Sequence, residues 1–215
     1  MIKAVIFDLD GTLIDSNEVH AISWLKAYNF FGYYKVTLDD VRNCLGIRGD
    51  LMTEKLLGKE AVKRYNEMRV VKDRIFLKLL RSGDVKVYPD VYEVLPALKK
   101  KGLKLCVASA TSIPLLIITL EYFNIIDYFD AMVAGEEVSR SKPEPDLYLE
   151  ALRRVNVSPR ESVIVGDTIF DVIPAKTIKA TSVLIKRVNP HNTILSDVKP
   201  DYIITSLNEL LNIIT

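Results

Sequence analysis

Two carboxylates stand two residues apart at the end of the first apolar run of the chain. Asp8 and Asp10 belong to the segment DLDGT (8–12), which follows the run IKAVIF (2–7). Residues two apart in a strand point to the same side, so both carboxylates leave the strand together. They do so at the strand's C-terminal end, where open α/β sheets bind ligands. Gly11 lets the backbone turn away sharply. These residues predict a polar site, with a solvated acidic turn as the alternative.

Polar groups also follow three later apolar runs. Ser109 ends the second predicted strand, and Lys142 follows the third. Asp167 ends the fourth, and Asp171 lies one helical turn further on. A hydroxyl beside free N–H groups can receive a phosphate oxygen, and two acids can hold a hard cation. Singly, they could be a loop serine, a solvated lysine and a helix N-terminal charge pair. Four such strand ends in succession predict one crevice that collects them all.

Short apolar runs alternate with helical stretches over most of the chain. This alternation is typical of an α/β fold with a doubly wound, Rossmann-like parallel sheet that helices cover on both faces. The predicted strands are 2–7, 103–108, 131–134, 162–165, 182–185 and 202–204. The predicted helices are 91–101, 114–123, 145–155, 171–179 and 207–213.

Residues 16–83 break this alternation, and no strand is predicted there. Ser16 can cap the first of several helices. We therefore predict an all-helical cap (16–83) inserted into an α/β catalytic core (1–15 and 84–215), with hinges at the two junctions. Helices are expected to begin near Asn17 and near 39–40, and one long amphipathic helix is expected over 60–80, with Val62, Tyr65, Met68, Ile75 and Leu79 on or near its apolar face.

Composition limits the class of protein. Of the 215 residues, 49% are hydrophobic and 27% are charged, which is typical of a globular protein. The formal net charge of +1 gives no excess that would favour a nucleic acid or an anionic membrane as partner. Two cysteines are too few for a disulfide framework, and no signal-peptide or membrane-spanning pattern occurs, so we expect a cytoplasmic protein. The lack of glutamine and the many lysines favour a thermophile source.

Together, these groups resemble the motifs of the haloacid dehalogenase superfamily. The resemblance covers essentially the whole chain. The stretch 15–20 with Trp24 looks like the branch that holds phosphoglycolate phosphatases, small sugar phosphatases and β-phosphoglucomutase. The four motifs are DLDGT at 8–12, Ser109, Lys142 and GDTIFD at 166–171.

The resemblance implies how the acids would work. Asp8 would be the nucleophile that forms an aspartyl phosphate. Asp10 would protonate the leaving alcohol and then deprotonate the water that hydrolyses the intermediate. Mg²⁺ would be held by Asp8, the backbone carbonyl of Asp10, and Asp167. Asp171 would orient waters or the Asp167 carboxylate from behind.

The resemblance also implies a phosphate-binding set and an activity. Ser109, the N–H of Ala110 and Lys142 would bind the oxygens of the transferring phosphoryl group. The implied protein is a Mg²⁺-dependent phosphatase for a small phosphorylated metabolite, either 2-phosphoglycolate or a sugar phosphate. A non-catalytic phosphometabolite-binding protein with a degenerate site is the alternative from another class.

Two other activities of the superfamily match the residues less well. A dehalogenase would lack the second acid of the first motif, whereas Asp10 is present. A mutase resembling β-phosphoglucomutase is closer, because His20 resembles its cap junction and Arg48 resembles the arginine that holds its distal phosphate. The mutase pattern, however, carries an acid just before the aspartate of the fourth motif, where this chain has Gly166. The residues favour a phosphatase. His20 and Arg48 remain candidate cap residues for substrate, with a packed hinge residue and a solvated arginine as alternatives.

The predicted helix 114–123 is apolar nearly all the way round. Only Thr119 and Glu121 interrupt it. A helix that flanks a sheet usually keeps one solvated face. We therefore hypothesise that the cap or a second subunit covers part of this helix, in a monomer or a homodimer respectively. The alternative is an unusually deep position of the helix in the monomer core.

Overall fold

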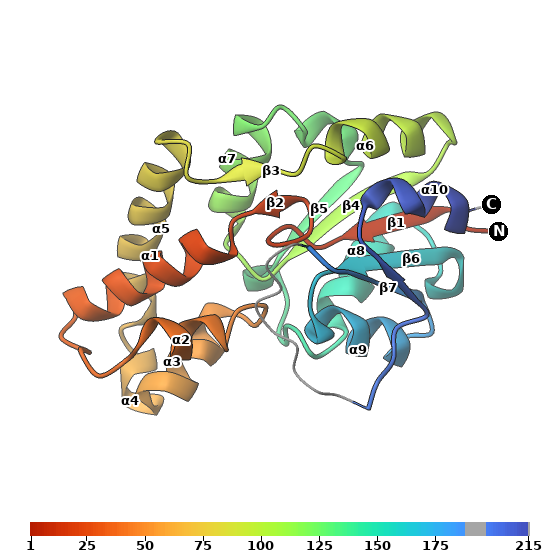
Figure 1. Ribbon diagram of the computed structural model, residues 1–215. Coiled ribbons are helices and arrows are strands. Elements are labelled where there is room, and N and C mark those ends of the chain that lie inside the picture. The colour runs from red at the N-terminus through yellow and green to blue at the C-terminus, as the bar shows by residue number, and fades with distance from the viewer. Residues whose placement is uncertain (188–196, 215) are drawn as a thin grey trace.

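The computed structural model describes residues 1–187 and 197–214. A six-stranded sheet forms its centre, and the helices lie around this sheet in Figure 1. The strand order is β5-β4-β1-β6-β7-β8, and every neighbouring pair is parallel. All six predicted strands are present, and the doubly wound α/β fold is confirmed. The strands are β1 (Ala4–Phe7), β4 (Lys104–Ser109), β5 (Ala131–Ala134), β6 (Ser162–Gly166), β7 (Thr181–Ile185) and β8 (Tyr202–Ile204).

Helices cover both faces of the sheet, because alternate side chains of β1 enter two different cores. Val5 and Phe7 pack with the helices on one face, whereas Ala4 and Ile6 pack with those on the other. The first face carries α6 (Val91–Lys100), α7 (Ile113–Tyr122) and α10 (Leu210–Ile213), and the second carries α8 (Asp146–Val155) and α9 (Ile169–Thr177). Short 3₁₀ turns are η1 (Ile126–Tyr128), η2 (Gly135–Glu137), η3 (Pro159–Glu161) and η4 (Leu207–Glu209), the last of which begins the predicted helix 207–213.

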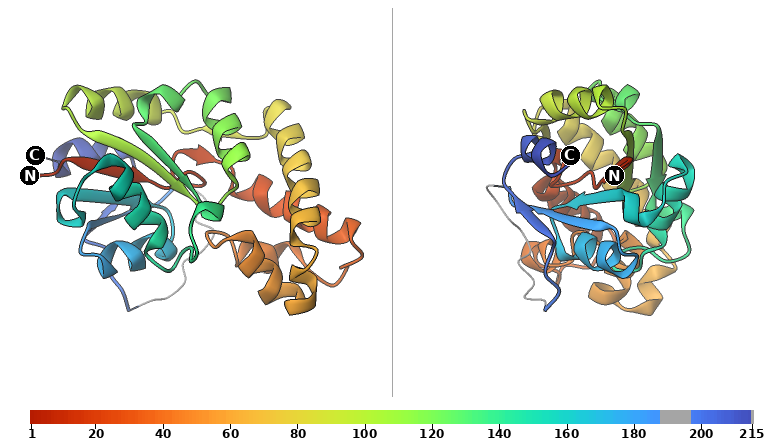
Figure 2. Two further views of the ribbon diagram at one scale, coloured as in Figure 1. Left: turned by 180° about the vertical axis from the view of Figure 1, so that it is seen from behind. Right: turned by 90° about the vertical axis from the view of Figure 1, so that its right-hand side faces the viewer.

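A separate group of helices, here called the helical unit (17–81), lies beyond the carboxyl ends of the strands (Figures 1 and 2). It has its own apolar core around Trp24, Tyr28 and Met68. It contains α1 (Asn17–Phe30), α2 (Leu38–Arg42), α3 (Gly49–Leu57), α4 (Lys59–Val62) and α5 (Tyr65–Arg81).

One prediction for the helical unit was wrong, and one helix was missed. The segment expected to be one helix over 60–80 is divided into α4 and α5. The division follows i→i−3 hydrogen bonds from Lys63 and Arg64, which tighten the last turn of α4 and end it. Helix α3, between Gly49 and Gly58, was not predicted at all, because its apolar pattern is too short to stand out.

The buried face of α5 also differs from the predicted one. The expected stripe included Ile75 and Leu79, but the fully buried positions are Met68, Lys72, Phe76 and Leu80, each four residues after the last. Residues four apart lie on the same face of a helix. The sequence did not predict this face, because a lysine at its centre is typical of a solvent-exposed position.

The chain passes between the sheet and the helical unit twice, and these two connecting segments form a small two-stranded sheet. Strand β2 (Ile14–Asp15) runs antiparallel to β3 (Lys86–Val87), a pairing that the sequence did not predict. Ser16 precedes α1 as expected, but no side chain caps that helix. The Ser16 hydroxyl instead donates to Asp10 Oδ1 at 2.6 Å, so a residue predicted to cap α1 contributes to the polar site.

Helix α7 is only partly covered. Leu115, Leu116 and Leu120 are buried in the sheet core, while Ile118 and Tyr122 remain 37% and 46% exposed. Coverage of this face by a second subunit therefore stays a prediction. In the described part of the chain, none of the helices has the length and apolar character needed to cross a membrane.

Candidate active site

The carboxyl ends of the central strands meet the helical unit at a cavity of about 70 Å³. Asp8 and Asp10 line it after β1, and Asp167 lines it after β6. Lys142 reaches it from the loop before α8. The structure thus brings the candidate residues of separate motifs to one place, although 134 positions separate Lys142 from Asp8.

Lys142 is a buried cation held between two acids. Its Nζ donates to Asp8 Oδ1 at 2.6 Å and lies 2.7 Å from Asp171 Oδ1, and its side chain is 1% exposed. Burial acts to lower the pKa of Lys142, but Asp171 and Asp8 outweigh it and hold that pKa above its ordinary value. The ammonium therefore stays charged at neutral pH, and Lys142 is not a solvated surface lysine.

Asp8 and Asp167 form a crowded acidic pair. Burial raises the pKa of Asp8 to about 7, helped by Asp171 and Asp10 and opposed by Lys142. Burial, Asp8 and Asp171 raise the pKa of Asp167 well above its ordinary value. Oxygen atoms of Asp8, Asp167 and Asp171 all lie within 4.8 Å of one another. Uncompensated carboxylates at this spacing disfavour their own ionisation unless a cation joins them.

The acidic pair fits a hard divalent cation. Asp167 Oδ1 is buried and has no hydrogen-bond partner among the described residues. Its other oxygen accepts from Asn17 Nδ2 at 2.9 Å. Gly11, at φ +76°, passes so close that a Cβ there would lie 2.0 Å from Asp167 Oδ2. The backbone at Gly11 is therefore packed against Oδ2 of Asp167, while Oδ1 stays free. A free carboxylate oxygen is the kind of ligand that Mg²⁺ prefers.

Both oxygens of Asp171 are already engaged. Oδ1 accepts from the Tyr148 hydroxyl at 2.6 Å, in addition to its contact with Lys142. Oδ2 accepts from the backbone N–H and the hydroxyl of Thr168, at 3.1 and 2.8 Å, at the start of α9. Its described contacts thus hold Lys142 in place, whereas the resemblance implied that it would orient waters or Asp167. Tyr148 and Thr168 were not predicted.

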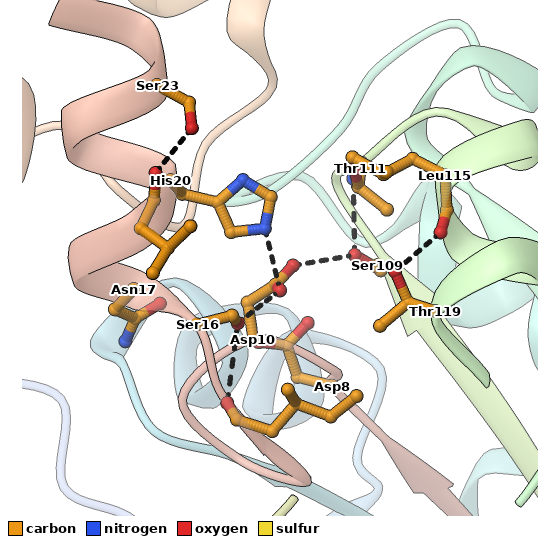
Figure 3. Close-up of polar contacts among 12 residues, drawn as sticks. Asp8, Asp10, Ser16, Asn17, His20, Ser23, Ser109, Thr111, Leu115 and Thr119 are labelled. Carbon is orange, nitrogen blue, oxygen red and sulfur yellow. Dashed lines mark hydrogen bonds and ion pairs between the residues drawn. The ribbon is translucent and has the colours of Figure 1, made fainter. Parts of the chain in front are cut away.

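Asp10 lies at the junction between the sheet and the helical unit (Figure 3). Its Oδ1 is 2.9 Å from His20 Nε2 and accepts from Ser16, while Ser109 Oγ lies 3.4 Å from Oδ2. Burial acts to raise the pKa of Asp10, but His20 and the Ser16 hydroxyl outweigh it and hold that pKa well below its ordinary value. Burial lowers the pKa of His20, whose ring stacks on Phe76 at 4.2 Å. The contacts from His20 and Ser16 therefore hold the Asp10 carboxylate in a fixed position.

Arg48 bridges the helical unit to the sheet instead of pointing into solvent. Its Nε and Nη2 donate to the Asp50 carboxylate at 2.7 and 2.8 Å. Its Nη1 donates to the carbonyls of Val138 and Gly135, at 3.0 and 3.3 Å, in the segment after β5. Arg48 lines a second, outer cavity of about 280 Å³, and it does not line the inner cavity that holds Asp8.

Gly166 makes room for Asp171. A Cβ at residue 166 would lie 2.2 Å from Asp171 Cγ, a distance that real Cβ atoms do not show. The acid that the mutase pattern places here would therefore displace Asp171 from Lys142 and Tyr148. Asp171 can therefore occupy its position only because residue 166 is a glycine.

Gly166→Ala is expected to lower both stability and activity. Forcing a methyl group into this packed position should cost about 1–3 kcal/mol of unfolding free energy, and moving Asp171 should lower kcat because Lys142 loses a partner. Urea unfolding and phosphate release measure the two effects. Gly32→Ala controls for loss of stability alone, because its φ of +90° strains any side chain while no atom lies near its Cβ position. A Gly166→Ala enzyme with wild-type kcat would contradict the linkage.

The match to a known family decides the identity of the chain. A family model of haloacid dehalogenase-like hydrolases matches residues 5–185. The chain belongs to this family. The resemblance drawn from the four motifs is therefore confirmed at the level of the family.

Relatives over nearly the whole chain support the same class of enzyme. The chain is 31% identical over 212 residues to pyrophosphatase PpaX of Bacillus velezensis, covering 99% of this chain and 96% of the relative. It is 29% identical over 221 residues to a phosphorylated carbohydrates phosphatase of Thermotoga maritima, covering 97% and 100%. The prediction of a phosphatase-type hydrolase is confirmed, while these relatives differ in substrate.

The fold has close counterparts among solved structures. CbbY of Rhodobacter sphaeroides, solved in complex with phosphate, superposes with a TM-score of 0.86 at 24% identity, covering 98% of this chain and 96% of that one. At this level of identity, the superposition shows that the two proteins share a fold and shows nothing further about this haloacid dehalogenase-like hydrolase.

Proposed function

We propose that this protein is a Mg²⁺-dependent phosphatase that hydrolyses a small phosphorylated metabolite through an aspartyl phosphate on Asp8. The observation that carries the proposal is the buried contact of 2.6 Å between Lys142 Nζ and Asp8 Oδ1, beside an Asp167 oxygen without a partner among the described residues. A nucleophilic carboxylate must approach an anionic phosphoryl group, and a fixed ammonium at its side offsets the repulsion. A purely structural ion pair would not need the adjacent acidic pocket.

The chain's own residues account for both halves of such a reaction. Asp8 attacks phosphorus, and the Ser109 hydroxyl, the Ala110 N–H and Lys142 bind the phosphoryl oxygens. Asp10 in its protonated form delivers its proton to the leaving oxygen, and the carboxylate that results takes a proton from the attacking water, which restores the protonated form for the next turnover. Contacts from Ser16 and His20 to Oδ1 hold Asp10 in place, and Oδ2, which lies 3.4 Å from the Ser109 hydroxyl of the phosphate-binding group, would carry the proton.

A divalent cation fits the acidic pocket described above. Asp8, the backbone carbonyl of Asp10, and Asp167 would hold Mg²⁺, and Asp171 would stand behind them. When bound, Mg²⁺ supplies positive charge to the phosphoryl oxygens and offsets the repulsion among the carboxylates. Asn17 and Gly11 keep Asp167 in position for that role.

The helical unit is proposed to act as a cap over this site, with 16–83 as the cap and 1–15 plus 84–215 as the catalytic core. The paired crossings β2 and β3 would form the hinge. His20 and Arg48 support this division, because each links the helical unit to the sheet across the junction. Closure would exclude water from the leaving group until the aspartyl phosphate has formed.

The mutase alternative receives less support from the residues around the site. Arg48 is the candidate for gripping a second phosphate, yet Asp50 and backbone carbonyls already occupy its donors. Gly166 leaves no space for the acid of the mutase pattern while Asp171 keeps its position. The same two observations support hydrolysis over phosphoryl return.

Phosphate release is expected with Mg²⁺ alone. Purified protein should release inorganic phosphate from p-nitrophenyl phosphate and from a metabolite ester without any bisphosphate activator, and EDTA should abolish the activity. The measurement is phosphate formed with and without Mg²⁺. Conversion of β-glucose 1-phosphate to glucose 6-phosphate with negligible phosphate release would favour the mutase. Binding of phosphate esters without any turnover would favour the non-catalytic alternative.

A further inference from the structure

The chain after β1 forms a tight turn, here called the β1 turn (9–14), which carries Asp10. The carbonyl of Leu9 accepts from the N–H groups of Leu13 and Ile14, at 2.9 and 3.1 Å. These internal hydrogen bonds fix the shape of the turn. Its orientation toward the rest of the sheet depends on contacts that reach it from other segments.

The carbonyls of Thr12 and Leu13 accept hydrogen bonds from outside the β1 turn. Arg187, just after β7, donates from Nη2 to the carbonyl of Thr12 at 2.6 Å. The backbone N–H of Tyr88, directly after β3, donates to the carbonyl of Leu13 at 3.1 Å. Since 175 positions separate Arg187 from Thr12, this side chain ties the turn to a distant part of the chain.

Arg187 is itself held in one orientation. Its Nη1 donates to Asp90 Oδ2 at 2.8 Å, and its Nη2 donates to Asp90 Oδ1 at 3.2 Å. The centre of the guanidinium lies 3.9 Å from the centre of the Tyr88 ring. A planar guanidinium that is gripped along one edge and covered on one face keeps a fixed direction for its remaining N–H. That direction leads to the Thr12 carbonyl.

Asp90 anchors this arrangement to two further elements. It immediately precedes α6, and its Oδ2 accepts from the Leu207 N–H at 2.8 Å and from the Ser206 hydroxyl at 3.1 Å, at the start of η4. The side chains of Arg187 and Asp90 are only 9% and 13% exposed. A buried ion pair adds little stability over apolar residues of similar size, because desolvation offsets its attraction. Stability alone therefore does not account for this pair, whereas its hold on the Thr12 carbonyl does.

Resting on the proposed function, we propose that Arg187, oriented by Asp90, is a positioning residue that holds the β1 turn so that Asp10 stays aligned for proton transfer. Neither Arg187 nor Asp90 is among the described residues that line the inner cavity, so both act through the backbone of the turn. The same turn packs at Gly11 against the Asp167 carboxylate, and a shift of the turn would disturb that contact as well.

The test follows p-nitrophenolate release by Arg187→Met after rapid mixing with p-nitrophenyl phosphate and Mg²⁺. Attack by Asp8 on this substrate needs no proton for the leaving group, so the first equivalent should appear as fast as in the wild type. Hydrolysis of the aspartyl phosphate needs an aligned Asp10, so the steady-state rate should fall by about 10- to 100-fold. Asp90→Asn, which keeps an acceptor oxygen for the Leu207 N–H, should change the two phases in the same direction and carries the test if Arg187→Met does not fold.

Asp130→Asn is the matched control, because Asp130 also accepts from one backbone N–H and from cationic side chains, those of Lys99 and Lys104, but lies just before β5, at the opposite end of the sheet. It should lose stability and keep wild-type rates in both phases. A wild-type steady-state rate in folded Arg187→Met or Asp90→Asn would overturn the inference, as would an equal fall in the first equivalent and the steady-state rate, which reports only a loss of folded protein. Failure of the wild type to hydrolyse p-nitrophenyl phosphate would instead contradict the proposed phosphatase itself.

Discussion

Asp8→Asn is expected to abolish turnover while the protein remains folded. An amide cannot attack phosphorus and is a poorer cation ligand, so kcat should fall by at least about a thousandfold, as expected when a nucleophile is removed. The fold should persist because Lys142 keeps its 2.7 Å contact with Asp171. The measurements are steady-state hydrolysis of p-nitrophenyl phosphate and thermal unfolding of the same sample.

The control for this variant is Asp127→Asn, which makes the same chemical change at an exposed residue of η1. It should keep wild-type activity. Retention of more than about a tenth of wild-type kcat by folded Asp8→Asn would rule out Asp8 as the nucleophile, because losing a covalent step costs far more than tenfold.

Asp10→Asn is expected to lower kcat by roughly 10²–10⁴-fold on an alkyl phosphate, which is the usual worth of general acid–base catalysis. The loss arises because the leaving alkoxide is no longer protonated. p-Nitrophenolate leaves without a proton, so this variant should still release it in a burst of about one equivalent before slow hydrolysis. Rapid mixing that follows p-nitrophenol formation measures the burst.

The burst distinguishes the chemistry of Asp10 from a structural role. Loss of Asp10 as a mere hinge contact, through His20 and Ser16, would slow both substrates alike and remove the burst. His20→Asn offers a matched comparison, because its amide can still donate to Asp10. It should be affected much less than Asp10→Asn on the alkyl phosphate.

The sequence predicted the sheet and the motif residues because those signals are local. Each strand is a short apolar run, and each candidate group stands at its end, so Asp8 and Ser109 could be placed without knowing any contact. The partners of these groups come from distant segments: Asn17 meets Asp167 across 150 positions. Tyr148, on α8, reads as an ordinary core residue until its contact with Asp171 is seen.

Other features could not be predicted because packing overrode local preference. Lys72 lies in the buried row of α5, where cation–π contacts with Trp24 and Phe76 and the neighbouring Asp73 compensate its burial. Ser16 stands where a capping residue is expected, but Asp10 competes successfully for its hydroxyl. In both cases a carboxylate near the cavity, Asp73 or Asp10, outweighed the preference that the local sequence suggests.

The covalent intermediate provides the most direct test of the proposed mechanism. Wild-type protein is mixed with substrate and Mg²⁺, quenched in acid within the first turnover, digested and analysed by mass spectrometry. We expect one phosphoryl group on the peptide that contains Asp8, removable by hydroxylamine and absent from Asp8→Asn. Rapid substrate hydrolysis with no phosphorylated Asp8 at any quench time, together with an active Asp8→Asn, would contradict the mechanism.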